Sequence, residues 1–119
     1  MAPSVSIIIP AYNASATLGE TLRSASACTY HPLEIIVIDD GSTDNTLDIA
    51  RRHAETDSRI RVLHQENAGV CRARNYAVSE SVGEYIMPVD SDDLIVPEFI
   101  SLAAAILDMR PEVKVVQPR

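Results

Sequence analysis

The sequence predicts an α/β fold with a doubly wound, mainly parallel sheet. Short β-branched runs alternate along the chain with segments whose apolar residues recur at helical spacing. The first runs are continuously apolar, as is typical of strands that are covered on both faces. Such alternation implies right-handed crossovers and helices on both faces of the sheet. With 119 residues, the chain has the length of a single domain with its own core.

Five strands are expected. The two at 5–10 and 33–38 are buried runs rich in isoleucine and valine, and a third, shorter strand is expected at 60–64. The fourth is expected at 85–89 and the fifth at 113–117, at the end of the chain. The sheet would therefore stop after about five strands and leave an open edge.

Four helices are expected between the strands. Ser15 is expected to cap a helix at 15–28. Ser42 or Thr43 is expected to cap a second helix, which ends near residue 56. A third helix is expected at 70–81, with Gly83 just past its end, and a fourth at 97–109. The residues expected to face the core are Leu18, Leu22, Ala25, Leu47, Ala50, Ala54, Val70, Ala73, Ala77, Val78, Phe99, Leu102, Ala103, Ile106 and Leu107.

Composition narrows the range of partners and compartments. The formal net charge of −7 argues against nucleic acid or an anionic membrane surface as the main partner. No apolar run is long enough to span a bilayer, and the N-terminus lacks the pattern of a signal peptide. Cys28 and Cys71 are expected to be core thiols in a reducing cytosol. The three histidines, which form no metal-binding spacing, are expected to be structural: His31, His53 and His64.

An acidic segment follows the fourth expected strand. Asp90, Asp92 and Asp93 put three carboxylates within four residues, with Ser91 between the first two. Carboxylates this close repel one another, which favours a bound cation, and their hard oxygen atoms suit Mg²⁺ or Mn²⁺. The alternative is a solvated turn in which one aspartate caps the next helix.

Other unusual residues follow the first two strands. Pro10, Ala11 and Tyr12 follow the first strand, and Asp39 and Asp40 end the second. If the strand order is 3-2-1-4, these residues and the acidic segment meet at the carboxyl ends of the strands, where parallel sheets bind ligands. The sequence therefore predicts a nucleotide and metal site there, although each group alone also has a structural explanation.

Four segments together resemble glycosyltransferase family 2. They are SIIIPAYN at 6–13, IVIDDGSTD at 36–44, NAGVCRARN at 67–75 and VDSDD at 89–93. The resemblance implies the GT-A fold and inverting transfer of a sugar from a nucleotide diphosphate donor. UDP is the first choice of nucleotide on family frequency.

The resemblance also implies roles for the residues of the nucleoside site. Pro10, Ala11 and Tyr12 would hold the base, with Tyr12 stacking on its ring. Asp40 would accept a hydrogen bond from the base edge, and Asp39 would support it. The segment at 67–75 contributes a basic residue near the nucleoside or the diphosphate, which is Arg74.

In the acidic segment the resemblance identifies an Asp-x-Asp motif. Asp90 and Ser91 would contact the nucleotide or a metal-bound water, and Asp90 and Asp92 would hold Mn²⁺ or Mg²⁺. Asp93 would support them or cap the turn, and the roles of Asp92 and Asp93 could be exchanged. Such a metal neutralises the charge that builds up on the leaving nucleotide diphosphate, while a carboxylate base takes the proton of the acceptor hydroxyl.

The chain departs from the family in length. Family members continue beyond this length, into the part that holds the acceptor site and the catalytic base. We therefore expect residues 1–119 to be a single, incomplete domain, the donor-binding half of a glycosyltransferase, without a catalytic base and inactive alone. The open sheet edge predicts a homo-oligomer. The full-length enzyme would use a saccharide or lipid-linked acceptor, in the cytoplasm or at the inner face of the membrane.

Two other functions remain open at this point. One is a metal-dependent phosphohydrolase or phosphotransferase with Asp39 as nucleophile, although such enzymes usually carry an aspartate where Gly41 stands. The other is a non-catalytic nucleotide-binding module. A dinucleotide oxidoreductase is disfavoured, because no Gly-x-Gly-x-x-Gly follows a strand.

Overall fold

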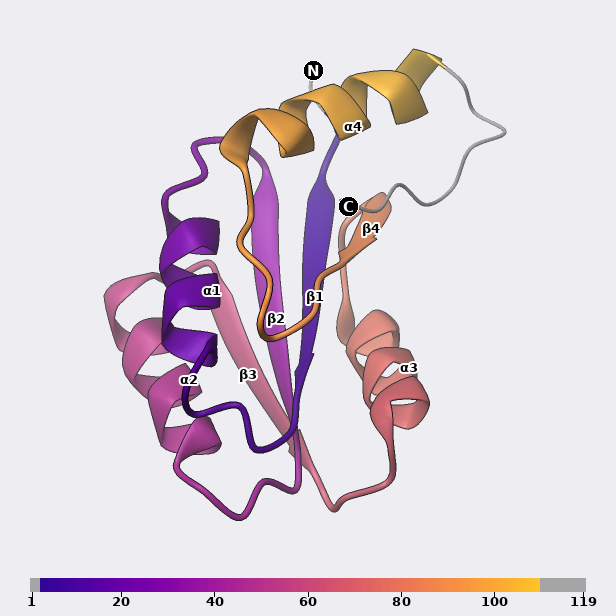
Figure 1. Cartoon of the computed structure of the whole chain (residues 1–119). Coiled ribbons are helices and arrows are strands. Elements are labelled where there is room, and N and C mark those ends of the chain that lie inside the picture. The colour runs from indigo at the N-terminus through magenta and orange to yellow at the C-terminus, as the bar shows by residue number, and fades with distance from the viewer. Residues whose placement is uncertain (1–2, 110–119) are drawn as a thin grey trace.

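The computed structural model describes residues 3–109, which form one sheet flanked by helices (Figure 1). Four strands and four helices alternate along the chain. Their bounds are β1 Val5–Ala11, α1 Leu18–Ser26, β2 Leu33–Asp40, α2 Thr46–Thr56, β3 Ile60–Gln65, α3 Val70–Glu80, β4 Tyr85–Pro88 and α4 Pro97–Met109. The strand expected at 113–117 lies outside the described residues.

The sheet has the strand order β3-β2-β1-β4, and all of its pairings are parallel, as predicted. β1 lies at the centre, with Ile7 opposite Ile35 of β2 on one side and Met87 of β4 on the other. The chain order reverses between β1 and β4, and this is where an open parallel sheet forms a ligand crevice. Within residues 3–109, β4 pairs only with β1.

Alternate residues of the strands supply two cores, one on each face of the sheet. Ile7 and Ile9 of β1 pack with α1, α2 and α4, whereas Ile8 packs with the small residues Ala73 and Ala77 of α3. Figure 1 shows α1 and α2 on one side of the sheet and α3 on the other. Burial on both faces explains why the central strands read as continuous apolar runs.

The starts of α1 and α2 differ from the prediction. α1 begins at Leu18 rather than near Ser15, whose backbone N–H instead donates to Asp44 at 3.3 Å. α2 begins at Thr46, and the hydroxyl of Ser42 accepts from the backbone N–H of Asn13 at 2.9 Å. The polar residues expected as caps therefore join the two loops to each other.

The inward faces of α3 and α4 also differ in part from the prediction. Val70 and Val78 are exposed, and so is Cys71, which was expected in the core. In α4, Ile100, Ala103 and Ala104 face the core, whereas Leu102 is 63% exposed. In the part of the chain that the structure describes, no helix has the length and apolarity needed to cross a bilayer.

Candidate nucleotide and metal site

A groove crosses the carboxyl ends of β1, β2 and β4. One part, a cavity of about 270 Å³, is lined by Pro10, Ala11, Tyr12, Asp40, Asn67, Gly69 and Val70. The adjoining part, of about 560 Å³, is lined by Pro10, Tyr12, Asn13, Ala14, Ala16, Thr17, Val70, Asp90, Ser91 and Asp92. Pro10, Tyr12 and Val70 line both parts, so the two parts lie side by side. The structure thus brings most of the predicted site residues together.

The loop after β1 presents Tyr12 to the groove. The Tyr12 side chain is half-exposed, whereas Ala11 beside it is buried. Asn13 adopts a positive φ of 47°, a conformation that asparagine tolerates better than most residues. Its side-chain oxygen accepts from the backbone N–H of Thr43 at 2.8 Å. This bond fixes the turn that leaves the Tyr12 ring facing open space.

Asp40 holds the loop at 65–69 against the end of β2. One carboxylate oxygen accepts from Gln65 Nε2 and from the backbone N–H of Ala68, both at 2.8 Å, and the other accepts from the backbone N–H of Gly69 at 3.1 Å. Burial alone would raise the pKa of Asp40, but these hydrogen bonds outweigh it and hold the pKa below its usual value. Asp40 is therefore an ionised part of the groove wall.

Gly41 allows that loop to approach β2 closely. Its φ is +70°, and a Cβ atom at this position would lie 2.5 Å from the backbone nitrogen of Asn67. The side chain of Asn67 in turn donates to the backbone carbonyl of Asp40 at 3.0 Å. Asn67 and Gly69 line the groove without having been predicted to do so, and Val70, which was expected in the core, lines it too. All three lie in the segment at 67–75 that carried the resemblance.

Asp39 lies behind the groove rather than in its lining. Its side chain is 1% exposed, and one of its oxygens lies 2.9 Å from Nδ1 of His64. Its other oxygen has no hydrogen-bond partner among the described residues. This burial argues against Asp39 as the nucleophile of a phosphotransferase.

Arg74 reaches the acidic segment from α3. Its Nη2 lies 3.5 Å from Oδ1 of Asp90, a long contact between two partly exposed side chains. Its Nε is buried and has no hydrogen-bond partner in the described part of the chain. Arg74 therefore brings a positive charge to the end of the groove at the acidic loop.

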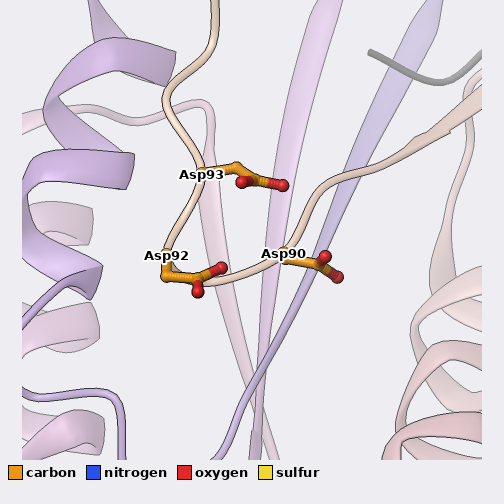
Figure 2. Close-up of side chains that lie close together, drawn as sticks. All are labelled: Asp90, Asp92 and Asp93. Carbon is orange, nitrogen blue, oxygen red and sulfur yellow. The ribbon is translucent and has the colours of Figure 1, made fainter. Parts of the chain in front are cut away.

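The loop between β4 and α4 gathers three carboxylates (Figure 2). Asp90, Asp92 and Asp93 are all exposed, and each offers an oxygen within 4.8 Å of the others. Among residues 3–109, Asp92 and Asp93 have no ion-pair partner. Exposed carboxylate oxygens at this spacing fit a hard divalent cation such as Mg²⁺ or Mn²⁺.

Comparison with known proteins agrees with this geometry. The chain is 44% identical over 96 residues to the glycosyltransferase GlyG of Streptococcus pneumoniae, a match that covers 80% of this chain and 32% of GlyG. It superimposes with a TM-score of 0.82 on S. aureus TarS in complex with UDP-GlcNAc, at 33% identity, covering 91% of this chain and 32% of that one. The mannosyltransferase PcManGT of Pyrobaculum calidifontis, in complex with GDP-Man and Mn²⁺, gives a TM-score of 0.84 at 30% identity. That match covers 90% of this chain and 33% of PcManGT.

These matches confirm the predicted fold class and family. The sheet and its flanking helices match those of nucleotide-sugar transferases of the GT-A type. The chain spans about a third of the length of the relatives it matches. The family model "Glycosyl transferase family 2" matches residues 6–119. The chain therefore belongs to glycosyl transferase family 2.

Proposed function

We propose that this chain is the donor-binding part of a metal-dependent glycosyltransferase. The full-length enzyme would transfer a sugar from a nucleotide diphosphate to an acceptor hydroxyl with inversion. The observation that carries this proposal is the pair of adjoining cavities, one lined by Tyr12 and Asp40 and the other by Tyr12, Asp90 and Asp92. A nucleotide diphosphate has the matching shape and charge: a flat base at one end and an anionic group that needs a cation at the other.

We assign the nucleoside to the end of the groove beside β2. Tyr12 offers a half-exposed ring for stacking on the base, with Pro10 and Ala11 beneath it. The ionised carboxylate of Asp40 faces the same cavity, where it can accept from a base N–H. Asp39 would support Asp40 as its neighbour in β2, where it bonds to His64 and to the backbone N–H of Ser42.

The diphosphate belongs at the other end. Asp90 and Asp92 would hold Mn²⁺ or Mg²⁺, with Ser91 between them and Asp93 able to exchange roles with Asp92. When bound, the cation would neutralise charge on the leaving nucleotide diphosphate. Arg74 would add a second positive charge beside Asp90.

We assign the acceptor site and the catalytic base to parts of the enzyme outside this chain. The match to GlyG takes in 80% of this chain but only 32% of GlyG, so most of that relative lies outside the matched part. On this proposal residues 1–119 are one incomplete domain, which binds donor and does not transfer sugar alone. The acceptor would be a saccharide or a lipid-linked saccharide, and the enzyme would work in the cytoplasm or at the inner face of the membrane.

Calorimetric titration tests the donor site. UDP and GDP are titrated into the chain with and without Mn²⁺, and the titrations are repeated on Asp92→Ala and on Asp48→Ala, which changes an exposed acid of α2. We expect Mn²⁺-dependent binding of one nucleotide, with UDP the first choice. Binding should be lost in Asp92→Ala and kept in Asp48→Ala.

Two results would count against the proposal. Nucleotide binding that is unchanged in Asp92→Ala would remove the acidic loop from the site. If neither nucleotide binds, the titration is repeated on a longer chain that includes the rest of the enzyme, and a second failure there would reject the nucleotide site.

A further inference from the structure

The loop that carries the three acids is fastened to the rest of the molecule at both of its ends. At its start, the backbone N–H of Val89 donates to the carbonyl of Ile8 in β1 at 2.9 Å. At its end, the backbone N–H of Ile95 donates to the hydroxyl of Ser24 at 2.9 Å. Within it, the N–H of Asp93 donates to the carbonyl of Asp90 at 3.1 Å and closes a turn.

A buried hydroxyl of α1 holds the middle of this loop. Thr21, which is 1% exposed, donates from Oγ1 to the carbonyl of Ser91 at 2.9 Å. The alternative acceptor of that hydroxyl, the carbonyl of Thr17, lies farther away, at 3.4 Å. The bonded carbonyl therefore belongs to the residue between the two aspartates of the Asp-x-Asp motif.

Ser24 completes the connection between α1 and the loop. Its hydroxyl donates to the carbonyl of Thr21 at 2.7 Å while it accepts from Ile95. Both hydroxyls thus lie on one side of α1, one turn apart, and bond two points of the loop that are four residues apart. Neither residue belongs to the lining of the groove.

These bonds oppose the repulsion between the carboxylates. Three like charges at this spacing favour a wider loop, in which each carboxylate is better solvated. A loop that is already held in shape loses less conformational freedom when a cation arrives, and it therefore binds that cation more tightly.

We propose that Thr21 and Ser24 are positioning residues, which hold the acidic loop in the shape that receives a divalent cation. This inference rests on the proposed function, because that function assigns the cation to the loop. It adds that part of the affinity for the metal comes from hydroxyl groups of α1 that do not contact the metal.

The test is a titration of the chain with Mn²⁺ alone, in the absence of nucleotide. The concentration of free Mn²⁺ is measured by electron paramagnetic resonance. Thr21→Val keeps the shape of the side chain and removes the donor, and it should weaken Mn²⁺ binding by about three- to tenfold, the value of one hydrogen bond. Thr21→Ser restores the donor and should return the affinity to within about twofold of the wild-type value. Thr56→Val, which removes a comparable hydroxyl bond to the His53 carbonyl in α2, should leave the affinity unchanged.

Thermal unfolding without Mn²⁺ shows whether each variant is folded. If Thr21→Val does not fold, Ser24→Ala, which removes the acceptor of Ile95, takes its place with the same expected loss. The inference is overturned if folded variants bind Mn²⁺ as the wild type does, or if the wild type binds no Mn²⁺. Should Mn²⁺ bind in a Thr21-dependent way while nucleotides do not bind even in a longer chain, the proposed function fails and this inference stands.

Discussion

Gly41 shows at the scale of one residue how the groove wall depends on backbone conformation. Its positive φ and the short distance to Asn67 leave no room for a side chain. We expect Gly41→Ala to lower the free energy of unfolding by about 1–3 kcal/mol and to weaken nucleotide binding. Urea unfolding and calorimetry measure the two effects.

Gly19→Ala is the matched control for that substitution. Gly19 lies inside α1, and a Cβ atom there would meet nothing closer than 3.5 Å. Alanine should therefore stabilise the helix by about 0.5–1 kcal/mol. If Gly41→Ala is as stable as Gly19→Ala, the loop at 65–69 is not fixed in the way described.

The location of several candidate residues could be predicted because they follow strand ends in chain order. Tyr12, Asp40, Asp90 and Asp92 all reach the groove, as the parallel topology requires. The partners of Asp40 could not be predicted, because its bonds to Ala68 and Gly69 depend on how the loop after β3 folds back. The burial of Asp39 behind the groove depends on the same packing.

At the scale of elements, the turn between α2 and β3 ties the end of α1 to the sheet. Arg59 donates to the carboxylate of Asp57 and to two backbone carbonyls, that of Ser26 at 2.8 Å and that of Cys28 at 2.7 Å. The side-chain hydrogen bond from Arg59 lowers the pKa of Asp57 to about 2. The carboxylate is mostly buried, so this lowering contributes to stability.

The expected consequence is a loss of stability in acid. Because the folded pKa of Asp57 lies below its unfolded value, the stabilisation is complete above about pH 4 and is lost as pH falls towards 2. Asp57→Asn should be less stable than the wild type at pH 7, and the difference should shrink between pH 4 and 2. Denaturant melts across this range measure it, with Asp48→Asn as the control; a difference that stays constant with pH would contradict the assignment.

The helices and strands themselves were predictable, whereas the helix starts and some faces were not. Apolar runs and helical periodicity are local properties, and they located every strand and helix that the structure describes. Ser15 and Ser42 did not cap helices because the loops after β1 and β2 bond to each other, a tertiary contact. Which side of α4 is buried was decided by its contact with β1 and β4, so that Ile100 rather than Leu102 faces the core.

At the scale of the whole molecule, apolar side chains gather on and before α4. Leu94, Val96, Leu102 and Met109 are each at least 58% exposed, and among residues 3–109 β4 has a neighbouring strand on one side only. We expect the isolated chain to self-associate at micromolar concentration. Light scattering should show a dimer or larger species, and Leu102→Lys should shift it towards monomer. A monodisperse wild-type monomer would contradict this expectation.

The parallel order of the strands has a consequence for the evolution of the family. The proposed nucleoside end of the groove is shaped by the loop that Asp40 holds, and the proposed metal end by a separate loop bonded to α1, with β1 between β2 and β4. Two loops that are anchored on different elements can vary independently. On the proposed function, the preference for one nucleotide over another could therefore change through the loop at 65–69 while the acidic loop stays as it is, and one scaffold could serve many donors.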